Sequence, residues 1–193
     1  MSFLAELQKK KSKLRQTETT VTKADGQRYI ERYNAIEYIP PNVYGFVVDT
    51  KPDNTPALIT DHLYIGSQDC TAGNVLETYD IKHVLSLGIL VEVPVDSRFI
   101  NCLDLPETDI RDVLKQSLLY MRRSVNTKEN VLVHCNAGVS RTSMVAIGYL
   151  MQYQLMSFEE AYNLVKSKRP AVNPNDGFRK QLKAMKPGEL WIE

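Results

Sequence analysis

One short stretch, Val131–Thr142, constrains the fold and the chemistry of this chain more than any other. An apolar run ends at Cys135, small residues follow, and Arg141 stands six positions later, where an apolar helical pattern begins. This order predicts a strand, a tight loop and the N-terminus of a helix. The backbone N–H groups of such a loop point inward and bind anions, and the helix dipole adds positive potential. We therefore predict an anion-binding loop between Cys135 and Arg141.

The two residues that bracket this loop indicate phosphoryl transfer. The thiolate is the nucleophilic form of cysteine, and a helix N-terminus favours it, so Cys135 is the expected nucleophile. The planar fork of an arginine matches a phosphate group, so Arg141 is the expected clamp. The alternative is a buried cysteine at a strand end followed by a loop that only caps the helix, because cysteine is among the most buried residue types.

The chain from about Leu58 onward alternates short apolar runs with helical patterns. Such alternation predicts an α/β fold with a central, mainly parallel, twisted sheet flanked by helices. Because ligands bind at the carboxyl ends of parallel strands, the Cys135 loop is expected at that edge. Strands are expected over 62–66, 83–87, 99–105 and 131–133, and helices over 71–79, 110–126, 141–153, 157–169 and after an Asn175 cap.

The first 57 residues follow a different pattern. Residues 1–15 have helical periodicity, 17–22 and 28–33 read as the strands of a hairpin, and the prolines of 39–57 indicate a linker. We therefore expect an extension over 1–57, a catalytic domain over 58–187 and a tail over 188–193. The basic cluster Lys9–Arg15 indicates either a partner surface or a solvated helix end.

Composition excludes several classes of protein. The net charge of +1 gives no general attraction to nucleic acid or to a membrane, and no apolar run approaches the ~20 residues that span a bilayer. Three cysteines are too few and too scattered for a disulfide scaffold, so a reducing compartment is expected: cytoplasm, nucleus or both. No Cys/His cluster has zinc spacing, and neither a metal nor a cofactor is expected. A monomer is expected because the chain can bury its own core.

The segment His134–Thr142 resembles the signature His-Cys-x5-Arg-Ser/Thr of the cysteine-dependent protein phosphatases, and most of all their atypical dual-specificity branch. The resemblance covers roughly residues 58–187. It implies a protein-tyrosine-phosphatase-like fold that hydrolyses phosphotyrosine and phosphoserine/threonine through a cysteinyl-phosphate intermediate. The segments that also match are 63–69, 81–85, 103–108 and 169–178.

The resemblance also implies a role for each loop residue. Cys135 attacks phosphorus, Arg141 binds the phosphoryl oxygens, and Thr142 donates to the thiolate. The alternative for Thr142 is a hydroxyl that satisfies backbone at the helix start. His134 is a supporting residue or a core histidine with satisfied partners. The backbone N–H groups that cradle the oxygens belong to Asn136, Ala137, Gly138, Val139, Ser140 and Arg141.

The general acid must come from another segment, and Asp104 is the candidate. It ends an expected strand and precedes Cys135 by 31 positions, which matches the family pattern. Asp109 and Asp112 are the rivals, but they read as a helix N-cap and an early-turn acid. Cys102 is either a thiol that traps oxidised Cys135 or an ordinary buried thiol.

The sequence leaves two interpretations for a pair of asparagines and suggests a role for one serine of the loop. Asn173 and Asn175 match a family loop near the active-site floor, and their plain interpretation is turn and cap residues. Ser140 is expected to brace the loop through local bonds to backbone.

Three functions fit the sequence. The first is a protein phosphatase whose substrates, by resemblance, are phosphorylated proteins of mitogen-activated kinase pathways. The second is a phosphoinositide or RNA 5′-phosphatase, which the uncharged residues 136–140 disfavour. The third is a scaffold with dispensable catalysis, which the presence of Cys135, Asp104 and Arg141 disfavours.

Overall fold

The structure, a computed structural model, describes residues 19–22, 28–32, 35–39 and 53–190, and the chain divides into two units, residues 1–43 and 44–193. The smaller unit contains an antiparallel sheet in the order β1-β2-β3. Its strands are β1 (Thr19–Thr22), β2 (Arg28–Arg32) and β3 (Ala35–Ile39). The predicted hairpin is confirmed as β1 and β2, whereas β3 was not predicted. The predicted helix over 1–15 and residues 40–52 of the predicted linker lie outside the described residues.

The larger unit is built on a five-stranded sheet in the order β4-β5-β8-β6-β7. The pairs β5–β8, β8–β6 and β6–β7 are parallel, and only β4 runs antiparallel to its neighbour β5. The prediction of a mainly parallel central sheet is therefore confirmed, with β8 in the middle. The strands are β4 (Ala57–Thr60), β5 (Leu63–Gly66), β6 (Ile81–Leu87), β7 (Asp96–Ile100) and β8 (Asn130–His134).

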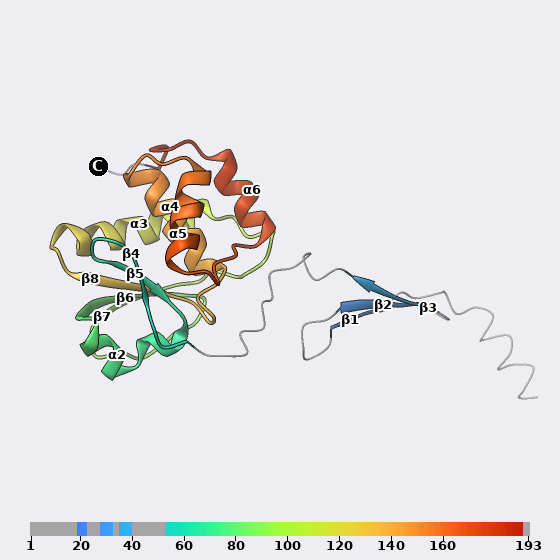
Figure 1. The fold of residues 1–193 in the computed structure, drawn as a ribbon, viewed down its shortest axis with the longest axis horizontal. Coiled ribbons are helices and arrows are strands. Elements are labelled where there is room, and N and C mark those ends of the chain that lie inside the picture. The colour runs from blue at the N-terminus through green and yellow to red at the C-terminus, as the bar shows by residue number, and fades with distance from the viewer. Residues whose placement is uncertain (1–18, 23–27, 33–34, 40–52, 191–193) are drawn as a thin grey trace, which may run out of the picture. The chain divides into compact units, whose positions relative to one another are not determined.

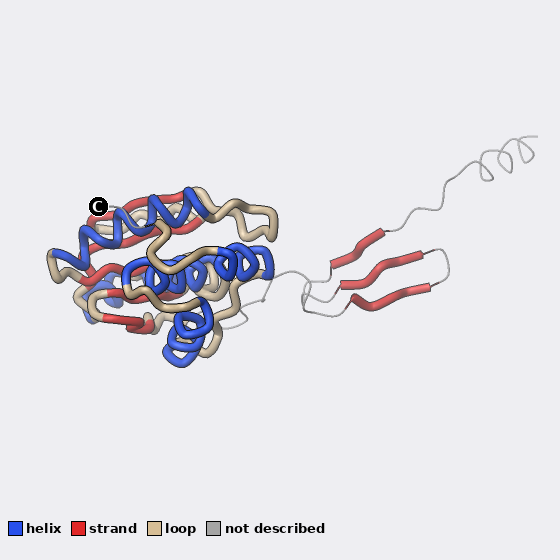
Figure 2. Tube along the Cα trace, turned by 90° about the horizontal axis from the view of Figure 1, so that it is seen from above, coloured by secondary structure: helices blue, strands red, loops and turns tan. Residues whose placement is uncertain are grey.

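Helices cover both faces of this sheet (Figure 1). Helix α2 lies on one face, and α3 to α6 lie on the other, an arrangement that the view from above also shows (Figure 2). The helices are η1 (Gln68–Thr71, a 3₁₀ turn), α2 (Gly73–Thr78), α3 (Arg111–Asn126), α4 (Arg141–Tyr153), α5 (Phe158–Lys168) and α6 (Asp176–Ala184). The predicted helix over 71–79 is thus shorter and follows a 3₁₀ turn. The capping box at Ser157 and Glu160 and the Asn175 cap are confirmed.

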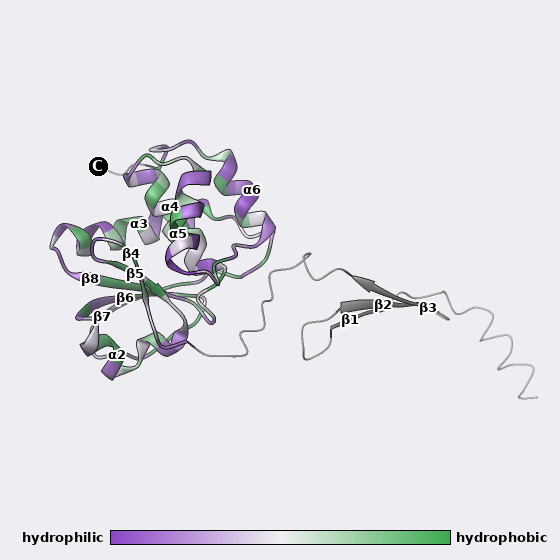
Figure 3. Ribbon diagram, viewed as in Figure 1, coloured by the Kyte–Doolittle hydropathy of each residue, from purple (hydrophilic) through white to green (hydrophobic). Residues whose placement is uncertain are grey.

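Side chains of alternate strand residues pack into two hydrophobic cores, one on each face of the sheet. In β8, Val131 and Val133 belong to the core under α3 to α6, whereas Leu132 belongs to the smaller core with α2. Helix α4 is buried along almost its whole length, from Thr142 to Gln152, and hydrophobic residues (green) are seen along it in Figure 3. A helix that is apolar all round belongs in the middle of a core. The buried helix thus places its first residue, Arg141, next to the carboxyl end of β8.

One strand prediction was wrong. The sequence predicted a strand over 99–105, but β7 spans Asp96–Ile100 and residues 101–105 have no regular structure. The alternation that suggested a strand is real, because Ile100 and Cys102 are buried while Leu103 is exposed. Strand pairing ends at Ile100, and the alternation of burial continues past it. Asp104 therefore lies in a loop beyond the sheet rather than at a strand end.

The ends of the predicted catalytic domain need a small extension. Strand β4 begins at Ala57, and Leu190 is buried, with its N–H donating to Gln152 Oε1 at 2.6 Å. Residues 188–190 of the predicted tail thus pack on α4. None of the described helices is long and apolar enough to cross a membrane.

Candidate active site

The Cys135 loop lies at the carboxyl end of the central strand. Strand β8 ends at His134, and α4 begins at Arg141, so the six residues between them form the turn from sheet to helix. Cys135 is buried, and its Sγ accepts a hydrogen bond from Thr142 Oγ1 at 2.9 Å. The predicted contact between Thr142 and the cysteine is therefore present, and Thr142 itself is fully buried. The thiol sits at a helix N-terminus, where the dipole favours an anion.

The carbonyl groups of residues 136–140 all point outward, because each is bonded to a group outside the loop. Since the N–H of each peptide points opposite to its carbonyl, the N–H groups of residues 137–141 face the inside of the loop. This orientation makes the inside a cradle of donors for an oxyanion. Asn136 O accepts from Gln68 N, and the carbonyls of Ala137 and Gly138 accept from the Arg169 side chain. Val139 O accepts from Asn173 N and Ser143 Oγ, and Ser140 O accepts from Ser143 Oγ and Met144 N.

Two glycines make this geometry possible. Gly138 has φ +67°, and a Cβ there would lie 2.5 Å from the carbonyl carbon of Gly66. Gly88 has φ +71°, and a Cβ there would collide with Arg141 Nη1 and Cys102 O. Only glycine combines a positive φ with such close approach. Gly138 closes the loop, and Gly88 leaves room for the Arg141 side chain.

The Arg141 side chain is held by backbone carbonyls beside the loop. Its Nη1 donates to Leu87 O at 2.9 Å and to Cys102 O at 3.5 Å. Its Nε is buried and has no hydrogen-bond partner among the described residues. A buried donor without a partner is costly, and a phosphoryl oxygen would satisfy it. The Arg141 guanidinium is thus held through Nη1, while its Nε remains as a hydrogen-bond donor for a ligand.

Asp104 reaches the same loop, although its local structure differs from the prediction. Ser140 Oγ donates to Asp104 Oδ1 at 2.7 Å, and Asn175 Nδ2 donates to the same oxygen at 2.8 Å. The other oxygen, Oδ2, lies 3.7 Å from Arg141 Nε. Oδ1 is thus occupied by two hydrogen-bond donors, and Oδ2 is the oxygen that faces Arg141.

Sequence reasoning missed these two positioning contacts. Ser140 was expected to bond only to nearby backbone, yet it donates to Asp104 and accepts from Asn175 N at 3.1 Å. Asn175 caps α6 by accepting from Phe178 N at 2.9 Å, and its amide nitrogen still reaches Asp104. The cap was readable from the sequence. The second contact joins residues 71 positions apart, and no local signal indicates it.

The rival acids lie at the start of α3. Asp109 Oδ1 accepts from Arg111 N at 2.9 Å, so it satisfies a backbone donor of the first turn, although Ile110 is the residue at the cap position. Asp112 lies in the first turn of α3, where an acid favours the helix dipole. Asp112 is therefore the early-turn acid that the sequence suggested, whereas Asp109 lies one residue before the cap position and was wrongly predicted to be the cap itself.

His134 has partners on both ring nitrogens. Its Nε2 lies 2.7 Å from Ser86 Oγ and its Nδ1 lies 3.4 Å from Cys135 O. A carbonyl only accepts, so Nδ1 carries the proton and Nε2 accepts from the serine hydroxyl. Burial lowers the pKa of His134 to about 4, which keeps the ring neutral. Its geometry is that of a satisfied core histidine that also contacts the backbone of the nucleophile; the supporting role remains a prediction.

Cys102 is the other buried thiol of this edge. Burial raises the pKa of Cys102 to about 11 and outweighs the nearby charge of Arg141, which acts to lower it. A thiol that stays protonated at neutral pH is a weak nucleophile. The ordinary interpretation of Cys102 as a buried side chain therefore fits the structure better than a role in trapping oxidised Cys135.

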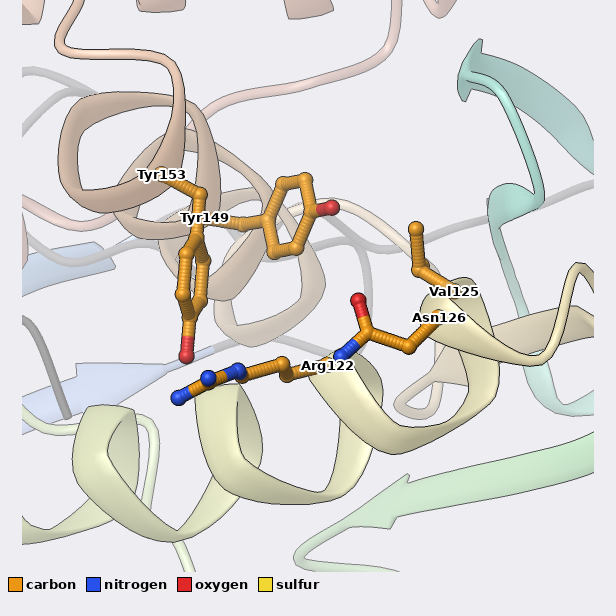
Figure 4. Close-up of a pocket in the computed structure, with 5 residues that line it drawn as sticks. All are labelled: Arg122, Val125, Asn126, Tyr149 and Tyr153. Atoms are coloured by element: carbon orange, nitrogen blue, oxygen red, sulfur yellow. The ribbon is translucent and has the colours of Figure 1, made fainter. Parts of the chain in front are cut away.

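A pocket of about 220 Å³ lies between α3 and α4 (Figure 4). Its lining comes from the last turns of both helices: Arg122, Val125, Asn126, Tyr149 and Tyr153. The C-terminus of α3 leads into the start of β8, so this pocket lies toward the amino ends of the strands, whereas Cys135 follows the carboxyl end of β8. Among the described residues, no group of three or more His, Cys, Asp or Glu side chains is arranged to hold a metal ion.

Comparison with known proteins agrees with this geometry. The family model described as "Dual specificity phosphatase, catalytic domain" matches residues 63–187. Mouse dual specificity protein phosphatase 19 is 34% identical over 188 residues, which cover 91% of this chain and 86% of that protein. The MAP kinase phosphatase with leucine-rich repeats protein 3 of Dictyostelium discoideum is 37% identical over 134 residues, 66% of this chain and 15% of that protein.

A solved structure shows the same fold. The crystal structure of human DUSP28 has a TM-score of 0.65 and 26% sequence identity, over 69% of this chain and 95% of that one. The family match covers more than half of the chain and includes the Cys135 loop, Asp104 and Asn175. The chain therefore belongs to the dual specificity phosphatase family and is a protein phosphatase that acts on phosphotyrosine and phosphoserine/threonine.

Proposed function

We propose that Cys135 is the nucleophile, Arg141 and the loop N–H groups are the phosphate site, and Asp104 is the general acid. A phosphate ester bound in the cradle presents its phosphorus to Cys135 Sγ. The sulfur–phosphorus bond forms while the ester oxygen–phosphorus bond breaks, and Asp104 Oδ2 gives its proton to the leaving oxygen. The N–H groups of residues 137–141 and Arg141 Nε stabilise the charge on the equatorial oxygens.

Thr142 acts in the second half of the reaction. Asp104, now ionised, takes a proton from water, and the water oxygen bonds to phosphorus as the sulfur–phosphorus bond breaks. The departing sulfur carries negative charge, and the Thr142 hydroxyl stabilises it by the hydrogen bond of 2.9 Å to Cys135 Sγ. This hydrogen bond, in a loop whose carbonyls point outward, is the observation that carries the assignment.

The expected substrates are phosphorylated proteins of kinase signalling, including mitogen-activated kinases. Two observations support this class. One relative is a MAP kinase phosphatase by name, and residues 136–140 of this chain carry no charged side chain to attract a polyanionic headgroup or RNA end. We also place the protein in the cytoplasm, the nucleus or both, as a monomer without nucleic-acid or membrane partners. The described part of the chain buries its own apolar core, which supports the proposal of a monomer.

The test is hydrolysis of p-nitrophenyl phosphate and of a doubly phosphorylated Thr-x-Tyr peptide. We expect wild type to hydrolyse both substrates and Cys135→Ser to hydrolyse neither. Asp104→Ala is expected to lose more activity on the peptide, because p-nitrophenolate leaves without a proton. Cys70→Ser is the matched control, since its hydroxyl can still donate to Asp53 O as the thiol does at 3.2 Å.

Three outcomes would contradict parts of this proposal. Full activity in a folded Cys135→Ser variant would remove the nucleophile assignment. Equal losses on both substrates for Asp104→Ala would remove the role of proton donor and leave Asp104 a structural role. Activity on p-nitrophenyl phosphate without activity on the peptide would move the substrate class away from phosphoproteins.

A further inference from the structure

Arg169 supports the catalytic loop from outside. It follows the last residue of α5, and its side chain is only 6% exposed. Nε donates to Gly138 O at 3.0 Å and Nη2 donates to Ala137 O at 3.3 Å. A guanidinium is always charged in proteins and holds its donors in one plane. Arg169 therefore fixes two successive carbonyls of the loop in their outward orientation.

Asp53 holds this arginine in place. Its Oδ2 accepts from Arg169 Nη1 at 2.5 Å, while its Oδ1 accepts from Thr55 N at 2.8 Å. The backbone of Asp53 is anchored separately, since its carbonyl accepts from Ser67 Oγ at 2.6 Å and from Cys70 Sγ at 3.2 Å. One carboxylate oxygen of Asp53 thus binds the arginine and the other binds Thr55 N, while the Asp53 carbonyl is held independently of the carboxylate.

The turn that anchors Asp53 contacts the same loop. In this turn, which joins β5 to η1, Gln68 N donates to Asn136 O at 2.9 Å. The turn also begins at Gly66, whose carbonyl lies against Gly138. The loop carbonyls of residues 136–138 are therefore held by the turn and by Arg169, and Asp53 is bonded to both of these supports.

We propose that Asp53 is a positioning residue of the catalytic loop and acts through Arg169. The proposal rests on the assignment of the loop as the phosphate cradle. Without the carboxylate, the buried guanidinium lacks its ion-pair partner and shifts toward water, since an unpaired buried charge is unfavourable. The carbonyls of Ala137 and Gly138 then lose their fixed direction, and the N–H groups behind them no longer converge on one oxyanion. Asp53 lies before the matched domain, residues 63–187, so this part of the site is outside the family match.

The test compares three variants in the full chain. Asp53→Asn keeps the shape and the backbone anchors but removes the charge, Asp53→Glu keeps the charge, and Asp61→Asn is the control in the exposed β4–β5 turn. The measurements are kcat and KM for p-nitrophenyl phosphate and the inhibition constant of orthovanadate, an oxyanion that occupies a phosphate cradle. Since small misplacements in a site lower rates strongly, we expect Asp53→Asn to bind vanadate about tenfold more weakly and to lower kcat by about the same factor. Asp53→Glu should recover part of both, and Asp61→Asn should match wild type.

A double-mutant cycle separates positioning from general stability. If Asp53 acts through Arg169, Asp53→Asn has no further effect on kcat or vanadate inhibition in an Arg169→Gln background. Additive losses would overturn the proposal, as would wild-type kinetics in Asp53→Asn with only a lower Tm. A wild type that neither binds vanadate nor turns over substrate would overturn the cradle itself, and the proposal with it. Wild-type vanadate binding with an unchanged Asp53→Asn would overturn the role of Asp53 alone.

Discussion

Two histidines on neighbouring strands show how differently the two ends of the sheet use polar side chains. His134 ends β8 at the carboxyl edge, is fully buried, and has the neutral partner Ser86. His83 lies near the start of β6, with 14% of its side chain exposed, between the carboxylates of Asp96 and Glu129 at 2.9 Å each. The contacts of the carboxyl edge lie largely out of water, including the ion pairs of Arg141 and Arg169, whereas at the amino edge one histidine bridges two partly exposed carboxylates.

We infer from this difference that the contacts at the carboxyl edge position catalytic groups, whereas those at the amino edge contribute to the stability of the fold. At the carboxyl edge, Cys135, Asp104 and Arg141 are partly or fully buried, and each contact fixes the direction of a reacting group. At the amino edge, the carboxylates of Asp96 and Glu129 are 61% and 46% exposed, so water and salt weaken their attraction to His83. Changes at the carboxyl edge should alter catalysis, and changes at the amino edge should alter only stability.

The largest expected effect is at Arg141. Arg141→Lys keeps a positive charge but loses the buried Nε donor and the planar fork, so kcat/KM should fall by about 10²–10³, as on removal of an oxyanion donor. The measurement is steady-state hydrolysis of p-nitrophenyl phosphate, with Arg98→Lys on the exposed part of β7 as control. A loss in Arg98→Lys of similar size would contradict the division between the two edges.

The second effect is the pH dependence of stability from His134. Burial lowers its pKa from 6.5 to about 4, so the native state resists protonation that the unfolded state accepts. The contribution of His134 to the free energy of unfolding is therefore fully present above pH 6.5. It is lost as the pH drops toward about 4, and the loss amounts to about 3 kcal/mol. Urea unfolding at a series of pH values measures this slope. His134→Asn should flatten it, and an unchanged slope in that variant would assign the loss to other groups.

A third, smaller effect is expected at Asn175. Asn175→Asp retains an oxygen to cap α6 but replaces the donor to Asp104 Oδ1 with a second carboxylate. The peptide reaction should slow by about 10–100-fold, because proton transfer from Asp104 depends on its position, while p-nitrophenyl phosphate should be affected less. Asn175→Ser, which caps without reaching Asp104, should fall between wild type and Asn175→Asp. Equal effects on both substrates would show that the change damages the cradle instead.

The smallest effect belongs to the amino edge. The hydrogen bond from His83, ahead of the other causes, lowers the pKa of both Asp96 and Glu129. These carboxylates contribute stability above their unfolded pKa values, and the contribution disappears as the pH falls through the folded values, in a lower window than that of His134. His83→Gln should lower Tm by about 2–4 °C at neutral pH and leave kcat unchanged. A clear loss of kcat would join the two edges functionally and contradict the comparison.

The sequence predicted what depends on neighbouring residues. The strand, loop and helix around Cys135 are consecutive in the chain, and the capping residues Ser157 and Asn175 act within one turn, so local patterns were sufficient. The end of β7 was misplaced because buried alternation continues through Cys102 after strand pairing has ended at Ile100. Asp104 was located by its distance from Cys135 in the chain, although the strand that justified its position is absent.

Contacts between distant segments had no signal in the sequence. Ser140 and Asn175 meet at Asp104, and Asp53 meets Arg169 across 116 positions. Each of these side chains also fits an ordinary surface or turn residue in its local context. Only the folded sheet, which gathers the loops after its strands at one edge, reveals that they share a site.

The most direct test of the account is to trap the phosphoryl group on the enzyme. Thr142→Ala should slow the second step more than the first, because the hydroxyl stabilises the departing thiolate. We predict that this variant, mixed with a phosphotyrosine peptide and quenched in acid, carries a phosphoryl group on Cys135, identified by mass spectrometry of the digest, and that Cys135→Ser carries none. A phosphoryl group on another residue, or none during full turnover, would contradict the cysteinyl-phosphate mechanism assigned to this loop.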